Sequence, residues 1–317
     1  MENGVSRRAL AAVVSYNVFR GLAVGGYMAL FPMYMVSLGY SMESLGLVIA
    51  ASGALSAFIL PALGVVIDRY GPRIMVFVTG LMQVAGILIA AYSSSLETLG
   101  LSYLLFLLSF LAGQPARMSF LARAVDEGVL GRAVGLTSSI FSMTRLIGPL
   151  AGGFAAEALG FKASFQALAL SSAVGLILFT VISTGVALRP LSRVPSLREA
   201  YMGVLRPGRS MAGVLGYVAL DRLGWSLWFP MLTGHLYSYG FSESEAGLIV
   251  TLGGVVQTLL LPPAGAMVDR LGAAKVLAVS EGLGVLTALL FADPSSIYRV
   301  YLGAALMGAS IAFWVPG

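Results

Sequence analysis

The stretch GVVIDRYGPR, residues 64–73, places one aspartate and two arginines between apolar runs, and GAMVDRLGAAK, residues 265–275, repeats its pattern. A shift of 201 residues, from 64 to 265, superposes the two stretches and the apolar runs before them. The tripeptide FPM also recurs, at 31–33 and 229–231. Such a repeat predicts two similar halves joined in one chain. The superposed pairs are Gly39 with Gly240, Gly46 with Gly247, Pro61 with Pro262, Gly64 with Gly265, Asp68 with Asp269, Arg69 with Arg270 and Gly71 with Gly272.

The composition indicates an integral membrane protein. Of 317 residues, 58% are hydrophobic and only 10% are charged, and the mean hydropathy is +0.91. A soluble domain carries about 25% charged residues, so this chain cannot cover a soluble globule with polar surface. With no cysteine and the single histidine His235, disulfides, thiolate metal sites and histidine clusters are excluded. We expect no metal and no cofactor.

Apolar runs long enough to cross a bilayer, about 20 residues each, are separated by short polar breaks. The first follows Arg7 and Arg8 in the manner of a secretory signal, but Arg20 interrupts it and no small-residue cleavage site follows, so we expect a retained helix. The repeated spans have the same orientation because an even number of spans separates them. The ten predicted spans are 11–37, 43–66, 74–93, 98–119, 133–156, 163–187, 211–237, 244–267, 274–292 and 296–317.

The basic residues predict the orientation in the membrane. Lys162 is the one basic residue in the breaks on one side, and thirteen basic residues lie in the breaks on the other side or at the span ends beside them. By the positive-inside rule the amino terminus is cytoplasmic, and we expect the protein in the plasma membrane. The same asymmetry explains the net charge of +5 without any nucleic-acid partner. The cytoplasmic set is Arg7, Arg8, Arg69, Arg73, Arg123, Arg132, Arg189, Arg193, Arg198, Arg206, Arg209, Arg270 and Lys275.

A proline- and arginine-rich segment, 189–210, separates the two halves. It predicts a cytoplasmic linker that also contacts anionic lipid. The expected organisation is a six-helix half at 1–188, the linker at 189–210, and a second half at 211–317 that holds only its first four helices.

The loop motif resembles the signature of the major facilitator superfamily: a glycine, three residues, Asp-Arg, one residue, a glycine and then basic residues. Here it comprises Gly64, Asp68, Arg69, Gly71 and Arg73, with an echo at Gly265, Asp269, Arg270 and Gly272. The resemblance implies an all-α membrane protein of two parallel six-helix halves with the substrate site between them. It also implies twelve helices, so we interpret the ten spans as a chain whose carboxyl-terminal half is incomplete, through truncation or the true absence of two helices.

Two functions of the loop motif are open from the residues themselves. Its arginines suffice as a cytoplasmic stop signal. Gly64 permits a close helix contact, Asp68 can accept hydrogen bonds at a helix amino terminus, and Gly71 suits a reversed backbone conformation. The resemblance implies that the aspartate helps to hold the halves together when the transporter faces outward, so we favour a conformational latch.

A second motif lies in the span 133–156, where Gly148, Pro149, Gly152 and Gly153 resemble a signature often associated with exporters in the family. Small residues allow close helix approach and proline frees a backbone carbonyl, so a bendable helix is expected. The resemblance favours export over uptake.

Ionisable residues deep in the spans predict the transport site, because charges inside a bilayer usually face a cavity. Arg20, Arg145, Asp221 and Arg222 each lie about ten residues into a span, ~15 Å deep, and the resemblance places these spans around the central cavity. One helix face carries Tyr16, Arg20 and Tyr27, and another carries Asp221, Trp225, Trp228 and His235. The alternative is structural: Arg20 or Arg145 pairs with Asp221 or with a backbone carbonyl.

Proton coupling needs a group that can be neutral or charged, and Asp221 is the predicted group, with Glu281 as its rival within the spans. The family commonly carries an arginine early in its fourth helix, whereas this chain has none there before Arg117, near the cytoplasmic end.

The predicted function is secondary active transport of a small organic solute by alternating access, coupled to protons or another ion. No GxxxxGK[ST] phosphate loop is present, so ATP hydrolysis is not expected, and the protein is not predicted to be an enzyme. The arginines favour an anionic or zwitterionic solute and the aromatic residues an amphipathic one. The alternative is a non-transporting sensor or scaffold of the same fold, or an inactive fragment.

Overall fold

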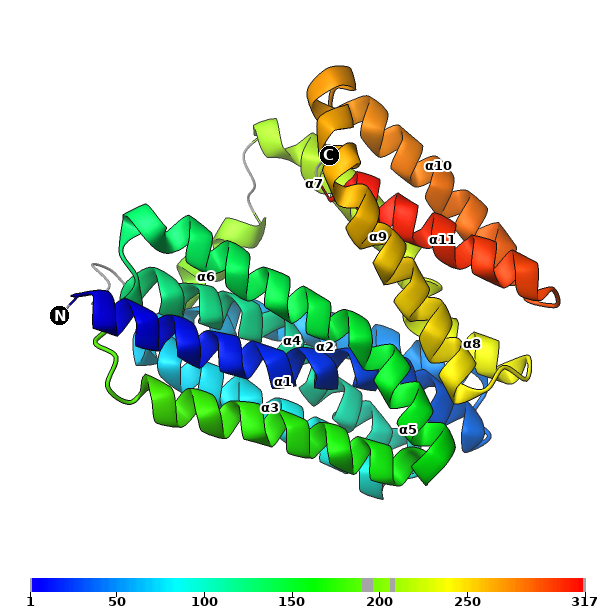
Figure 1. The fold of residues 1–317 in the computed structure, drawn as a ribbon, viewed down its shortest axis with the longest axis horizontal. Helices are drawn as coiled ribbons and strands as arrows, with labels where there is room; N and C mark the ends of the chain where they lie inside the picture. The colour runs from blue at the N-terminus through cyan, green and yellow to red at the C-terminus, as the bar shows by residue number, and fades with distance from the viewer. Residues whose placement is uncertain (1, 190–195, 206–208, 316–317) are drawn as a thin grey trace.

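A computed structural model describes residues 2–189, 196–205 and 209–315, and within these ranges every regular element is a helix (Figure 1). Parts of the predicted linker, 190–195 and 206–208, lie outside the described residues. The elements are α1 (Glu2–Ser37), α2 (Met42–Tyr70), α3 (Pro72–Tyr92), α4 (Leu96–Ala124), α5 (Glu127–Ser183), α6 (Leu197–Leu205), α7 (Arg209–Ser226), the 3-10 helix η1 (Phe229–Met231), α8 (Leu232–Ser238), α9 (Glu243–Leu271), α10 (Ala273–Ala292) and α11 (Ile297–Trp314).

Eight of the described helices are long and apolar enough to cross a membrane: α1 to α5 and α9 to α11. Seven of them each overlap one predicted span. The eighth, α5, is 57 residues long and overlaps two, 133–156 and 163–187. Within it Gly160 has a φ of 80°, a conformation that favours glycine and breaks the helical path between the two predicted spans. The predicted number of crossings, ten, stays a prediction.

The predicted span 211–237 is not one helix. The helix α7 ends at Ser226, and η1 and then α8 follow. Pro230 lies in the first turn of η1 and cannot donate a backbone hydrogen bond to the preceding turn. In the first half the same tripeptide, FPM, lies in the continuous helix α1 with Pro32 inside it. A proline therefore permits the break, and the surrounding structure decides whether it occurs.

The backbone repeats where the sequence does. Gly71 and Gly272, which end α2 and α9, have φ values of 91° and 85°, and each donates its N–H to a carbonyl four residues earlier. Gly39 and Gly240, before the same helices, have φ values of 87° and 92°. The reversed conformation predicted for Gly71 is confirmed, and the 201-residue repeat is one of structure as well as sequence.

The first half is built around α1, which packs along α5 through glycines. A Cβ added to Gly25 would lie 2.1 Å from the Arg145 carbonyl oxygen, and one added to Gly148 would lie 2.6 Å from the Leu22 carbonyl oxygen. Side chains therefore cannot separate the two backbones there. Figure 1 shows α9, α10 and α11 inclined away from α1 to α5, and the two groups approach each other near α8, at the end opposite the amino terminus.

The turn between α10 and α11 holds an exposed ion pair. The Arg299 Nη1 lies 2.6 Å from the Asp293 Oδ2. Hydrogen bonds from Ser295, together with the Arg299 guanidinium, lower the pKa of Asp293 below its ordinary value. Arg299 is therefore a surface arginine at a helix end, far in sequence from any predicted site residue.

Candidate functional site

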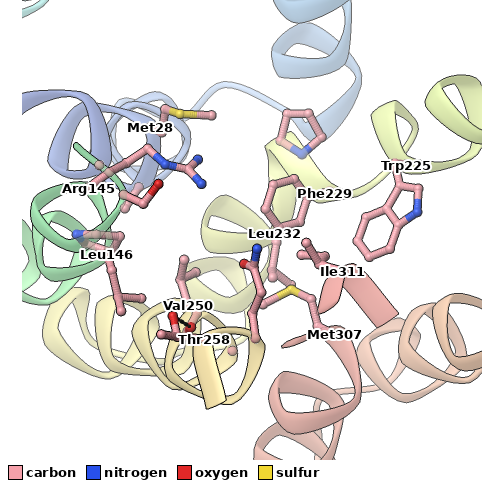
Figure 2. A pocket seen from close by; sticks show the side chains of 18 of the residues that line it. Met28, Arg145, Leu146, Trp225, Phe229, Leu232, Val250, Thr258, Met307 and Ile311 are labelled. Atoms are coloured by element: carbon pink, nitrogen blue, oxygen red, sulfur yellow. Dashed lines mark hydrogen bonds between the residues drawn. The ribbon is translucent and has the colours of Figure 1, made fainter. Parts of the chain in front are cut away.

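A cavity of about 450 Å³ lies between the two halves (Figure 2). Its walls come from α1 and α5 on one side and from α7, η1, α8, α9 and α11 on the other. Ligand pockets in proteins typically enclose about 300–1,000 Å³, so a small organic molecule fits this space. Most lining side chains are apolar or aromatic, among them Met28, Trp225, Phe229 and Met307.

At one end of the cavity, α5 and α9 touch through glycines. A Cβ added to Gly153 would lie 2.2 Å from the Glu243 carbonyl oxygen, and one added to Gly247 would lie 2.3 Å from the Pro149 carbonyl oxygen. At the same end the Glu157 carboxylate accepts a hydrogen bond from the Ser244 backbone N–H at 3.3 Å. The halves thus close against each other at this end, through the residues that carry the predicted second motif.

A second contact at this end joins α1 to α8. The Thr233 Oγ1 donates to the Ala29 carbonyl oxygen at 2.8 Å, and a Cβ on Gly234 would lie 3.0 Å from the Pro32 carbonyl oxygen. The helix break after Ser226 lets α8 lie close to α1. This contact and the α5–α9 contact together join the two halves at one end of the cavity.

Within the motif on α5, the four residues face different neighbours. Gly148 and Gly152 approach α1, where Cβ atoms would meet Gly26 at 2.6 and 3.2 Å. Gly153 approaches α9, and Pro149 lines the cavity. The motif therefore places the backbone of α5 against both halves at once.

Arg145 projects from α5 into the cavity, opposite the apolar side chains of Phe229 and Met307 (Figure 2). Among the described residues it has no hydrogen-bond acceptor and no ion-pair partner, and none of the lining residues is acidic. Ser142, Gln257 and Thr258 add neutral polar groups to the lining. Arg145 is thus an uncompensated positive charge in a largely apolar space.

Arg222 also lines the cavity, but its charge is compensated. Its Nε lies 2.8 Å from the Asp221 Oδ2, and its Cζ lies 4.0 Å from the centre of the Trp314 ring. A guanidinium at that distance is attracted to the ring face. Of the ionisable and aromatic residues predicted for the transport site, Arg145, Arg222 and Trp225 meet at this cavity.

Asp221 lines a second cavity of about 380 Å³ between α7 and α10, together with Trp228. Its side chain is fully buried. Glu281 lies in the same cavity and accepts a hydrogen bond from the Tyr217 hydroxyl at 2.8 Å. The ion pair joins the two cavities, because Arg222 lines the central one and Asp221 lines the second. Trp225 lines both cavities.

Tyr16, Arg20 and Tyr27 lie in the interior of the first half and do not line the central cavity. The Tyr27 hydroxyl pairs with the Ser102 hydroxyl at 2.7 Å, and the Arg20 Nη2 donates to the Ser109 carbonyl oxygen at 2.9 Å. The spacing correctly places these three side chains on one helix face, and in this structure that face packs on the neighbouring helices of the same half. For Arg20 the structure therefore agrees with the alternative given in the sequence analysis, a structural role in which it pairs with a backbone carbonyl.

Arg117 is a buried charge that the sequence analysis placed near the cytoplasmic end of its span. Because α4 continues to Ala124, Arg117 lies inside the helix and is 2% exposed. Its guanidinium lies beside that of Arg20. The helix α4 continues past the predicted span end at residue 119, and packing within the first half buries Arg117.

The loop motif behaves differently from the expectation in two respects. A Cβ on Gly64 or Gly265 would meet no atom within 4 Å, so neither glycine makes the expected close helix contact in this conformation. Asp68 is half-buried and Asp269 is exposed, and neither forms a hydrogen bond or an ion pair within the described part of the chain. Among the basic residues, Arg73 donates to the Val186 carbonyl oxygen and Arg69 lies over the Tyr70 ring at 5.8 Å.

The comparison with protein families identifies the fold. A family model described as Major Facilitator Superfamily matches residues 13–217 and, a second time, residues 214–317. The chain belongs to the Major Facilitator Superfamily. The two matches of one model agree with the two structural repeats.

Curated relatives in this superfamily align along most of the chain. The multidrug resistance protein MdtG of Citrobacter koseri is 25% identical over 309 residues, which cover 93% of this chain and 75% of the relative. The multi-drug resistance efflux pump PmrA of Streptococcus pneumoniae is 24% identical over 315 residues, with coverage of 95% and 77%.

Solved structures of the superfamily share the fold. The nucleoside transporter NupG superposes with a TM-score of 0.62 at 16% identity, over 96% of this chain and 80% of that one. A D-xylose-proton symporter superposes with a TM-score of 0.66 at 14% identity, over 97% and 80%. At such identities the likeness describes the fold alone.

Proposed function

We propose that this protein is a secondary transporter that exports small organic solutes by alternating access. The observation that carries the proposal is the central cavity, which is built from both halves, with the halves in close contact at one end of it. Alternating access requires a site of this kind, in which rocking one half against the other changes which end is open. Membership of the superfamily and the relatives named for multidrug resistance and efflux support both transport and its direction.

The orientation follows from the charges. The arginine-rich loops lie at the end of the halves opposite the α5–α9 contact, and the positive-inside rule makes that end cytoplasmic. The contact then closes the cavity toward the outside, and the structure corresponds to an inward-facing state. In this proposal 1–188 and 211–317 form the two moving halves, 189–210 is the tether between them, and the amino terminus is in the cytoplasm of a cell whose plasma membrane holds the protein.

Coupling to protons is assigned to Asp221. This carboxyl is buried between α7 and α10 and contacts the central cavity through Arg222. A change in its charge therefore changes the electrostatics of the cavity without any movement of the solute. Substrate binding relies on Arg145 and Trp225, and the loop motif acts in the outward-facing state, where Asp68 gains the contact that it lacks here.

Flux in proteoliposomes tests the proposal. The purified chain, reconstituted in a known orientation, should carry drug-like organic solutes in response to an imposed pH gradient or membrane potential, and protein-free liposomes should not. Binding of a solute without any flux would replace the proposal with the alternative, a sensor or scaffold of the same fold. The sign of the gradient that drives accumulation gives the direction of transport.

A further inference from the structure

We infer that the central cavity selects amphipathic organic anions, an inference that rests on the proposed transport function and specifies its substrate class. The carrying observation is the charge of the lining, which contains Arg145 and Arg222 and no aspartate or glutamate. A cationic solute would be repelled by the two guanidinium groups, since no carboxylate in the lining offsets them, and a neutral solute would leave the half-buried Arg145 guanidinium without an anionic partner.

The two arginines do not contribute equally. Arg222 is engaged on one side by Asp221 and on the other by the Trp314 ring. Arg145 has neither kind of partner within the described ranges. A charge in an apolar cavity is costly unless it is paired. A carboxylate, sulfonate or phosphate group on the solute would supply the missing acceptor, and the planar guanidinium can bind it in a bidentate manner.

The wall of the cavity opposite Arg145 determines which chemistry the uncharged part of the solute should have. Phe229, Trp225, Met307 and Ile311 lie across the cavity from Arg145 (Figure 2). Aromatic rings and flexible methionine side chains accept flat apolar bodies of varied outline. The solute therefore has an anionic head at α5 of the first half and an apolar, ring-containing body against the second half.

This arrangement also explains how one bound solute would interact with both halves of the transporter. Arg145 belongs to the first half and the apolar wall to the second, so a solute that carries both features contacts both halves at once. A solute that lacks the anionic head keeps apolar contacts with Met28 and Leu146 of the first half but loses the charged contact with Arg145. The charge thus separates a transported solute from a merely lipophilic one.

Three ligands with one aromatic body and different charges test the inference. These are 1-naphthaleneacetate, the neutral 1-naphthaleneacetamide and the cationic 2-(1-naphthyl)ethylammonium. Binding is measured by equilibrium dialysis against the purified chain in lipid nanodiscs, with empty nanodiscs as the blank. We expect the acetate to bind about 10- to 100-fold more tightly than the other two, as a charge-assisted hydrogen bond contributes on that scale.

Substitutions test whether Arg145 causes the preference for the anionic ligand. Arg145→Gln should weaken binding of the acetate about 10- to 100-fold and leave the amide unchanged, and Arg145→Lys should retain part of the preference because it keeps the charge without the fork. Arg299→Gln is the matched control, since Arg299 is an exposed arginine outside the cavity, and it should change nothing. An intact preference in Arg145→Gln, or tighter binding of the ammonium compound, overturns the inference.

The same ligands separate this inference from the proposed function. Flux of the ammonium or amide compound in preference to the acetate would leave transport standing and overturn the anion selectivity. Selective binding of the acetate without flux would sustain the site and overturn transport. If none of the three binds or is carried, both proposals fail.

Discussion

Arg20 of α1 and Arg117 of α4 hold their guanidinium groups against the same two aromatic rings in the interior of the first half. Their Cζ atoms both lie 5.9 Å from the centre of the Tyr16 ring, and 5.4 and 5.2 Å from that of Phe141. A Cβ on Gly113 would lie 2.9 Å from the Arg20 Nη2 and 3.2 Å from the Arg117 Nη1. Within the described residues no carboxylate pairs with either group, so two like charges share one buried site, balanced only by ring faces and one carbonyl.

Arg117→Gln should therefore raise the thermal unfolding temperature. The change removes one of two buried like charges and no hydrogen bond that the described residues make, and replacing buried ionic groups by uncharged ones can stabilise proteins by about 1–4 kcal/mol. Arg20→Gln should give a smaller gain, because it also removes the bond to the Ser109 carbonyl. Melting of the purified variants in detergent measures both. A clear loss of stability in Arg117→Gln would contradict this prediction. It would mean that the Arg117 guanidinium donates a stabilising hydrogen bond that outweighs its repulsion from Arg20.

Gly247→Ala should weaken the closed end of the cavity. The new Cβ would lie 2.3 Å from the Pro149 carbonyl oxygen, and because that neighbour is backbone, the helices must separate. Overpacking of this kind typically costs about 1–3 kcal/mol. Gly265→Ala, on the same helix, is the control, since its Cβ meets nothing within 4 Å.

Labelling from outside the membrane reports this opening directly. The chain has no cysteine, so Met28→Cys places a single thiol on the cavity wall. An impermeant thiol reagent added outside should modify it faster when Gly247→Ala is also present, and at the original rate with Gly265→Ala. Equal rates in all three backgrounds would show that this end is not closed by the glycine contact.

Asp68→Asn should reduce transport without reducing the stability of this conformation. Asp68 makes no hydrogen bond or ion pair in the part of the chain that the structure describes, so the inward-facing state loses nothing. If its contact forms only in the outward-facing state, the loss falls on the conformational equilibrium, where couplings of about 1–3 kcal/mol change rates or affinities about 5- to 150-fold. Flux per inserted molecule and the melting temperature are measured together, with the exposed Asp269→Asn as control. Unchanged flux would leave the motif as a topology signal.

The repeat was predictable because its signals are local. Gly71 has the positive φ that its place in the motif predicted, and Gly272, its counterpart in the repeat, has the same conformation. The structure adds a matching pair of caps, since the Ser41 and Ser242 hydroxyls accept hydrogen bonds from backbone N–H groups at the starts of α2 and α9. Apolar runs likewise predict where helices lie, because their length and composition are properties of single segments.

The assignment of faces was less predictable, because it depends on partners distant in sequence. The spacing of Tyr16, Arg20 and Tyr27 defines one face of α1, yet periodicity cannot say whether that face meets the cavity or α4. The helix break after Ser226 was also hard to predict, because it too depends on partners distant in sequence. The tripeptide FPM occurs in both halves and interrupts the helix in only one of them, so tertiary contacts such as that of Thr233 with Ala29 decide the outcome.

Asp221→Asn should abolish accumulation driven by a pH gradient while Glu281→Gln preserves it. Both carboxyls line the cavity between α7 and α10, but only Asp221 reaches the central cavity, through its ion pair with Arg222. Glu281 is bound to Tyr217, and its loss leaves the charge near the solute unchanged. Binding of the solute at fixed pH should persist in both variants, which separates coupling from recognition. Accumulation that survives in Asp221→Asn and fails in Glu281→Gln would transfer the coupling role to Glu281, and accumulation that survives in both would remove it from this cavity.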